Sequence, residues 1–389
     1  MEKENHLTFL KDVFLCSLGS YGGPEAHYGV FQSYLVKKKG YLSEDELSEL
    51  IGLYTLVPGP SSTQTITAIG YHVGGKKLAI LSFLVWALPA IVIMGLFGLF
   101  FGVIKSIGRL NDMIQFLPAV AIGFILYAGI NMTLKIGKNK SNILLYTVML
   151  ALSYFLVSYS MWIIPGLLLL GGLYQLLTHY DHSKRVKTSI KLNYWIVISV
   201  IGIAIFNEIM VIVFDQTLIT LLVSFYRYGY QVIGGGQVVI PLMITDLVQT
   251  GLISLEDFLA GYAIDQAIPG PLFSFASFIG SRAFSDSPYA LLIGILSSLS
   301  IFLPGILLVF FIYPLWKQAR NLTHVKHFLK GITITASSVV MTTGIKQVIN
   351  LDGEFVLYGI LGLTLVLLLT KKISAPLIVV LVLLIGLIF

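Results

Sequence analysis

The sequence predicts an all-α polytopic membrane protein made of two inverted-topology repeats with broken helices, and three observations support this prediction. The 389 residues are 56% hydrophobic and only 11% charged, whereas soluble domains carry about 25% charged residues. Most of the apolar segments are long enough to cross a hydrocarbon core, which takes roughly 17–25 helical residues. Further apolar segments are interrupted by glycine and proline, and matching interruptions recur in the second half of the chain.

The expected elements follow one another along the chain. The first half opens with interrupted segments at residues 10–36 and 45–73, and each is expected to form two half-helices around its break. Uninterrupted helices are expected at residues 78–104, 114–134, 143–160, 162–177, 194–214, 289–313, 328–349, 356–370 and 373–389. The interrupted segments either re-enter the membrane as hairpins or span it, and the distribution of basic residues favours hairpins.

The breaks define the half-helices, because proline suits the first turn of a helix and glycine is common just past the end of one. In the first half the breaks are Gly22-Gly23-Pro24 and Pro58-Gly59-Pro60, and in the second half they are Gly234-Gly235-Gly236 and Pro269-Gly270-Pro271. The helix before each second break is expected to start at a capping serine with an acid three residues later. These pairs are Ser43 with Glu46 and Ser254 with Asp257.

The two halves are an internal repeat, because matching residues lie 210–215 positions apart throughout. Pro58 matches Pro269, and Leu88-Pro89 matches Leu303-Pro304. An odd number of crossings separates the repeats whether the interrupted segments re-enter or span, so the second repeat is expected to be inverted. The segment at 194–214 has no partner in the second half. We therefore expect an N-terminal repeat at residues 1–192, a linker transmembrane helix at 193–216 and an inverted C-terminal repeat at 217–389.

The basic residues predict the orientation in the membrane. With hairpins and an inverted second half, most of the 25 lysines and arginines fall on one face, and positive residues mark the cytoplasmic side. The N-terminus is therefore expected in the cytoplasm and the C-terminus outside. Because loop lysines and arginines explain the net charge of +6, the expected partner is the lipid bilayer rather than nucleic acid.

The motifs around the breaks resemble those of the chromate transporter family in its long-chain, two-domain form. Residues 22–27 (GGPEAH) and 58–64 (PGPSSTQ) fit the motifs of the family's first half, and the two breaks of the second half also fit. Tyr21 and Ile233 stand where the family usually has phenylalanine. The resemblance covers nearly the whole chain. It implies an inner-membrane exporter of chromate, driven by protons, that confers chromate resistance.

The breaks themselves predict an anion site. Helix N-termini present free N–H groups and a partial positive charge, so half-helices that start at one place suit a tetrahedral dianion. The alternative is that the breaks are ordinary kinks, which transmembrane helices tolerate. The residues expected to bind the substrate are Gly22, Gly23, Pro24, Ala26, His27, Pro58, Gly59, Pro60, Ser61, Ser62, Thr63, Gln64, Gly234, Gly235, Gly236, Gln237, Pro269, Gly270, Pro271 and Ser274.

Titratable residues near the breaks are the candidates for proton coupling and for an anion path. Intramembrane acids and histidines are functional candidates by default. Glu25, His27 and Asp265 are the expected proton carriers. A neutral His27 hydrogen-bonded between helices is the alternative. The residues proposed for the anion path are Arg227, Arg282 and His72, although Arg227 could instead extend to the membrane interface.

Several classes of function lack their sequence signals. No nucleotide-binding P-loop, nucleophile elbow or metal-ligand spacing occurs, and Cys16 is the only cysteine. We therefore expect no enzyme activity, no cofactor and no metal. A sulfate or other oxyanion importer and an anion channel remain open as alternatives, and so does a homodimer with a second copy of the chain.

Overall fold

The computed structural model describes residues 6–137, 139–157, 159, 163–178, 194–214, 216–232, 239–315, 323–351 and 355–387. Every regular element in these residues is a helix. The helices there that are long and apolar enough to cross a membrane are Ser61–Ser106, Gly108–Leu134, Ala290–Ile312 and Lys330–Ile349, and shorter apolar helices accompany them. The predicted all-α membrane class is therefore confirmed.

The chain forms two compact units, each containing segments from both halves of the sequence. The first unit comprises Met1–Gly102, Thr188–Gly236 and Ile268–Arg320. The second comprises Val103–Lys187, Gln237–Ala267 and Asn321–Phe389. This division follows spatial contacts, whereas the predicted division at residues 192 and 216 follows the repeat; that division stays a prediction.

The first unit contains the broken helices. Its elements are α1 (His6–Leu18), α2 (Pro24–Val30), the π-helix η1 (Phe31–Lys38), α3 (Glu44–Leu56), α4 (Ser61–Ser106), α9 (Tyr194–Phe214), α10 (Thr217–Gln231), the 3₁₀ turn η4 (Leu272–Ser274), α13 (Phe275–Ala283), α14 (Ala290–Ile312) and η5 (Tyr313–Leu315). Helix α4 is kinked at Gly74 and Gly75, and its residues beyond Gly102 belong to the second unit.

Local sequence signals set the helix starts in this unit. A proline opens α2, as predicted, and α4 begins directly after Pro60. Ser43 caps α3: its hydroxyl accepts from the Glu46 N–H, while the Glu46 carboxylate accepts from the Ser43 N–H at 2.9 Å. This reciprocal capping box confirms the predicted start of α3.

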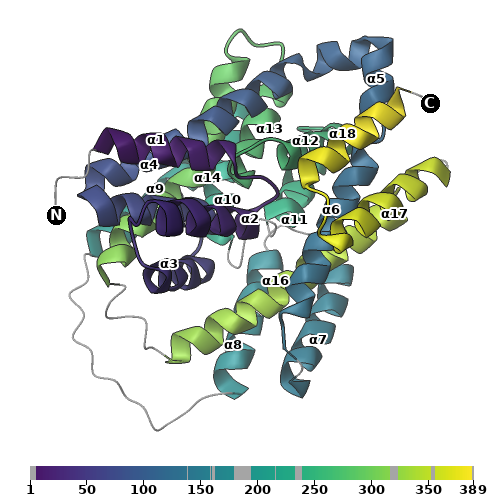
Figure 1. The fold of residues 1–389 in the computed structure, drawn as a ribbon. Coiled ribbons are helices and arrows are strands. Elements are labelled where there is room, and N and C mark those ends of the chain that lie inside the picture. Colours follow the sequence, from purple (N-terminus) through teal and green to yellow (C-terminus); the bar gives the residue numbers. More distant parts are fainter. Residues whose placement is uncertain are drawn as a thin grey trace. The chain divides into compact units, whose positions relative to one another are not determined.

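The first interrupted segment folds back on itself. Asp12 in α1 accepts hydrogen bonds from Tyr34 at 3.2 Å and Tyr41 at 2.6 Å, and its carboxylate lies 3.0 Å from Lys39 Nζ. Tyr34 lies within η1, and Lys39 and Tyr41 lie just beyond its end, so the chain that leaves α1 through the glycine break returns to it. Helices α1 and α2 with η1 appear in purple in Figure 1.

Helices α4 and α14 run antiparallel in the first unit. The rings of Phe83 and Phe302 lie 5.4 Å apart, and a Cβ added at Gly95 would lie 2.8 Å from Leu291 Cδ1. Contact positions therefore rise in residue number along α4, from 83 to 95, while they fall along α14, from 302 to 291. These two helices follow the second break of their respective halves, so they are equivalent elements of the repeat.

The second unit is a bundle around α16. Its elements are α5 (Gly108–Ile114), α6 (Leu117–Leu134), α7 (Lys140–Leu156), α8 (Ile163–Thr178), α11 (Val239–Met243), the π-helix η3 (Ile244–Val248), α12 (Leu255–Ala267), α16 (Thr323–Ile349), α17 (Phe355–Thr370) and α18 (Ala375–Gly386). Helix α16 packs against α6, α7 and α8, and Figure 1 shows α7 and α8 beside it.

Equivalent helices are also antiparallel in the second unit. A Cβ added at Gly129 of α6 would lie 3.1 Å from Met341 Cα, and one added at Gly344 of α16 would lie 2.6 Å from Leu126 Cδ2. At the start of α12, the Asp257 N–H donates to Ser254 Oγ at 3.1 Å, which confirms the second predicted cap. Lys105 Nζ lies 2.8 Å from Glu256 and 3.0 Å from Asp257, next to the positive end of α12.

Replacing Gly331 with valine is expected to lower the stability of the protein strongly. A Cβ at Gly331 would overlap the carbonyl oxygen of Gly171, where α16 crosses α8. Backbone cannot move aside as a side chain can, so we expect a loss of about 3 kcal/mol. The melting temperature of the purified protein in detergent measures this loss. Gly166→Val on α8 is the matched control, because none of the described residues lies within 4 Å of a Cβ there; an equal shift for both variants would contradict the prediction.

Candidate functional site

The breaks at Pro24 and Pro60 and the residues after Pro271 meet at one small cavity in the first unit. Its volume is about 10 Å³, close to the space that one water molecule needs. The residues that line it are Pro24, His27, Pro60, Ser61, Ser62, Leu272 and Phe273.

The first break places His27 on the cavity wall. Gly22 and Gly23 have φ values of 76° and 105°, a region that favours glycine, and the chain then enters α2 at Pro24. His27 lies one turn into this helix and is only 1% exposed. Its Nδ1 is hydrogen-bonded to Ser62 Oγ at 3.0 Å, and its Nε2 has no hydrogen-bond partner among the described residues.

Trp86 of α4 holds the imidazole in position. The rings of His27 and Trp86 meet edge to face with centroids 5.3 Å apart. Trp86 Nε1 donates to Thr63 Oγ1 at 3.2 Å, and Ser17 Oγ donates to the Trp86 carbonyl at 2.8 Å. These contacts support Trp86 where it packs on the imidazole; with Nδ1 bonded to Ser62, Nε2 is the ring atom left for another partner.

The second break brings the N-terminus of α4 to the cavity. Gly59 has a φ of 120°, and its N–H donates to the carbonyl of Val232 at 2.7 Å. Gln64 Nε2 donates to the carbonyls of Pro58 at 2.8 Å and Gly305 at 3.1 Å. The first-turn N–H groups at Ser61 and Ser62 have no intrahelical acceptor, so they and the two hydroxyls form a donor-rich wall with partial positive charge.

The residues that follow the break at Pro269-Gly270-Pro271 complete the lining of the cavity. Gly270 has a φ of 134°, and its N–H donates to the carbonyl of Ser20 at 2.8 Å. After Pro271 the chain makes the 3₁₀ turn η4 rather than entering an α-helix at once. This turn presents Leu272 and Phe273 to the cavity, and the Phe273 ring packs on Phe302 with centroids 5.8 Å apart.

The cavity therefore has one polar and one apolar wall. The polar wall offers N–H groups and two hydroxyls, which are donors that suit an anion, and an imidazole nitrogen. A volume of about one water molecule is too small for a tetrahedral oxyanion, so the described conformation is closed at this site.

Only part of the predicted binding set lines the cavity. The residues that do are Pro24, His27, Pro60, Ser61 and Ser62. Others shape the breaks without lining the cavity: Gly22, Gly23, Ala26, Pro58, Gly59, Thr63, Gln64, Pro269, Gly270, Pro271 and Ser274. Gly234, Gly235, Gly236 and Gln237 lie outside the described residues, as does the side chain of Glu25. The roles of all these residues stay predictions.

The other predicted titratable residues lie elsewhere. Asp265 is buried in α12 of the second unit. Arg227 of α10 makes a bidentate pair with Glu208 of α9, with N–O distances of 2.7–2.9 Å. Arg282 Nη1 donates to Ser285 Oγ at 3.3 Å, and His72 Nδ1 lies 3.0 Å from the Tyr313 hydroxyl.

Sequence reasoning missed three residues of interest. Glu208 could have been found as the one acid within the apolar segment at 194–214. Leu272 and Phe273 could have been found by the repeat, because they occupy the positions that Ser61 and Ser62 occupy in the first half.

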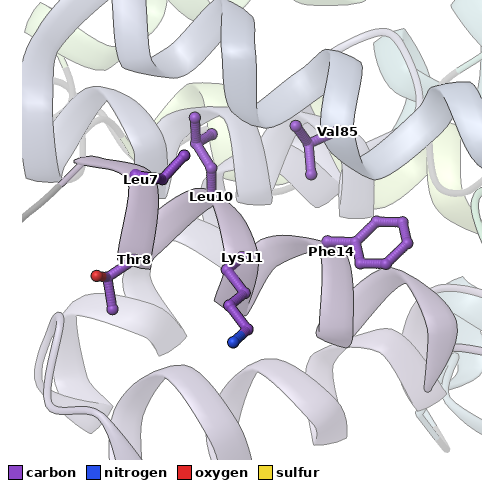
Figure 2. A pocket seen from close by; sticks show the side chains of 6 residues that line it. All are labelled: Leu7, Thr8, Leu10, Lys11, Phe14 and Val85. Atoms are coloured by element: carbon purple, nitrogen blue, oxygen red, sulfur yellow. The ribbon is translucent and has the colours of Figure 1, made fainter.

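A larger hollow lies between α1 and α4 of the same unit (Figure 2). It measures about 490 Å³ and is lined by Leu7, Thr8, Leu10, Lys11, Phe14 and Val85. It contains no residue of a break, and its walls are apolar apart from Thr8 and Lys11. The small cavity, where polar donors converge, is therefore the better candidate. Among the described residues no group of histidine, cysteine and acidic side chains could hold a metal ion.

Long apolar helices define a multi-pass membrane protein, and helices broken by glycine and proline at a common cavity are a feature of secondary transporters. The chromate transporter family model matches residues 7–176 and 219–387, and the chain belongs to this family.

Relatives extend over nearly the whole chain. A probable chromate transport protein of Synechococcus elongatus is 26% identical over 98% of this chain and 94% of its own length. The chromate transport protein of Cupriavidus metallidurans is 23% identical over 97% and 92%, respectively. An uncharacterized transporter of Methanocaldococcus jannaschii is 23% identical over 99% and 96%. No solved structure matches the chain.

Proposed function

We propose that this protein is a secondary active transporter that exports chromate, or a closely related tetrahedral oxyanion, across the inner membrane in exchange for protons. The observation that carries the proposal is the cavity at which the breaks meet, with the α4 N-terminus, Ser61, Ser62 and His27 on one wall. The choice of chromate as the substrate is based on the names of the relatives, which are a probable chromate transport protein and a chromate transport protein.

We also propose that the two halves are inverted repeats joined by α9. Equivalent helices run antiparallel within each unit: α4 with α14, and α6 with α16. The two blocks matched by the family model leave residues 177–218 between them, and α9 lies in this gap. This arrangement supports a cytoplasmic N-terminus and an external C-terminus, and it allows alternating access around the cavity.

Two of the three proposed proton carriers, Glu25 and His27, lie in the first half. His27 lines the cavity with Nε2 unpartnered among the described residues, and imidazole exchanges protons near neutral pH. Glu25 lies two residues before His27 on α2. The second-half counterparts of this pair are Gln237 and Val239, which carry no exchangeable charge. Asp265 of α12 is a third proposed carrier.

The test is chromate uptake into everted membrane vesicles, where uptake corresponds to export from the cell. We expect chromate to accumulate when a pH gradient is imposed and not when the gradient is collapsed. Chromate flux that ignores the gradient would indicate a channel. Accumulation of sulfate in its place would indicate a different oxyanion as the substrate, and uptake only in right-side-out vesicles would indicate an importer. Vesicles without the protein provide the background, and increased chromate resistance of the expressing cells is the corresponding result in vivo.

A further inference from the structure

We infer that Leu272 and Phe273 form an apolar gate that makes anion movement depend on the transport cycle. They occupy the positions at which an exact repeat would place a second pair of serines. This inference rests on the proposed transport function. It adds a role for residues that bind no anion themselves and that the motifs around the breaks do not single out.

The sequence repeat identifies the equivalent positions. Pro58-Gly59-Pro60 matches Pro269-Gly270-Pro271 at a constant separation. Continuing the match by two positions pairs Ser61 with Leu272 and Ser62 with Phe273. The next pair, Thr63 and Ser274, is again polar in both halves, so the chemical difference is confined to the two positions on the cavity.

The contacts around the breaks are reciprocal, as a two-fold relation requires. The Gly59 N–H donates to the Val232 carbonyl at 2.7 Å, just before the first break of the other half. The Gly270 N–H donates to the Ser20 carbonyl at 2.8 Å. Ser20 lies just before the first break of the first half, as Val232 does in the second half. Each half's second break is therefore tied to the same place in the other half.

The neighbouring helices repeat this relation. A Cβ added at Gly59 would lie 2.9 Å from Gly305 Cα, and one added at Gly270 would lie 2.5 Å from Ala90 Cβ. Ala90 follows Pro89 and Gly305 follows Pro304, so these two contacts are also equivalent. The two breaks are thus related by an approximate two-fold axis within the first unit.

The cavity lies on this axis, because it is lined by both members of each equivalent pair: Ser61 with Leu272, and Ser62 with Phe273. A symmetric site would have hydroxyls on both walls. Here one wall can bind an anion, and the facing wall offers only apolar side chains. An apolar constriction excludes water and ions until it widens.

The apolar wall is rigidly supported. Phe273 is 2% exposed and Leu272 is 8% exposed. The Phe273 ring packs on Phe302, which in turn packs on Phe83 with centroids 5.4 Å apart. Ser298 Oγ donates to the carbonyls of Phe273 and Ser274 at 3.3 Å, which ties the η4 turn to α14. The gate therefore opens only when α14 and the break move together.

The experiment compares two fluxes of chromate in proteoliposomes containing the purified protein. One is downhill flux without a pH gradient, and the other is accumulation driven by a gradient. In Phe273→Ser, which installs the residue found at Ser62, we expect downhill flux to rise about tenfold and accumulation to disappear. Phe273→Leu keeps the wall apolar and is expected to retain accumulation. Phe278→Leu is the matched control, because Phe278 is equally buried but packs on Phe101 away from the cavity.

Each result decides the question. Accumulation at the wild-type level in Phe273→Ser would overturn the gate, and so would loss of both fluxes in a variant that elutes as a monodisperse protein. Leu272→Ser removes a smaller apolar side chain than Phe273→Ser does, and it replaces that variant if Phe273→Ser does not fold. Unchanged downhill flux in Leu272→Ser would refute the inference. If the wild-type protein accumulates sulfate and not chromate, the proposed substrate is wrong and the same comparison with sulfate tests the gate. A wild-type protein that moves neither anion would overturn the transport proposal, and the gate with it.

Discussion

Replacing Gly59 with valine is expected to abolish transport and to destabilise the protein by at least about 3 kcal/mol. Gly59 has a φ of 120°, which a β-branched residue does not adopt without strain. A Cβ there would also lie 2.8 Å from Gln64 Nε2 and 2.9 Å from Gly305 Cα. Relief of either clash would move the N-terminus of α4 away from the cavity. Vesicle accumulation of chromate and the melting temperature in detergent measure the two effects.

Gly52→Val is the control for this variant. Gly52 lies in α3, just before the same break, is exposed, and has none of the described residues within 4 Å of a Cβ. Valine has a slightly better helix propensity than glycine, so stability there should be unchanged or slightly higher. If Gly59→Val transports normally, the break at Pro58-Gly59-Pro60 is not part of the transport site.

Replacing His27 with phenylalanine is expected to reduce gradient-driven accumulation by at least about a hundredfold, equivalent to about 2.7 kcal/mol. Phenylalanine preserves a ring against Trp86 but removes both nitrogens. The cavity would lose Nε2, and Ser62 would lose its hydrogen bond at 3.0 Å. The measurement is the initial rate of chromate accumulation over a range of imposed pH gradients, because a lost proton carrier changes the dependence on the gradient and not only the rate.

Ser62→Ala separates the two contributions of His27. It removes the hydrogen bond to Nδ1, together with one hydroxyl of the cavity wall, and leaves Nε2 in place; the rate should fall about fivefold, as expected for the loss of roughly 1 kcal/mol, with an unaltered dependence on the pH gradient. His6→Phe, the same substitution at an exposed position of α1, should leave transport unchanged. A His27→Phe variant with an unaltered dependence on the pH gradient would rule out His27 as the proton carrier.

The sequence by itself determined the membrane class, the starts of α2, α3 and α4, and the spacing of the breaks, because these depend on composition and on local backbone chemistry. Pro24 at the start of α2, Pro60 before α4 and the Ser43–Glu46 capping box of α3 each act within one helical turn. Their consequences can therefore be read without knowing what packs nearby. The spacing of the breaks in the two halves is likewise a property of the chain alone.

Only the tertiary structure decided which residues of the breaks face the cavity and what faces them. Pro24 and Ala26 stand two positions apart on α2, yet only Pro24 lines the cavity, because the direction of each side chain depends on how α2 packs on Trp86 and α4. The pairing of Arg227 with Glu208 joins residues on different helices, which periodicity within either helix cannot reveal. Leu272 and Phe273 are ordinary apolar residues in a membrane sequence. Their position opposite Ser61 and Ser62 arises from contacts between the two halves, and it is this long-range packing that makes the walls of the cavity unequal.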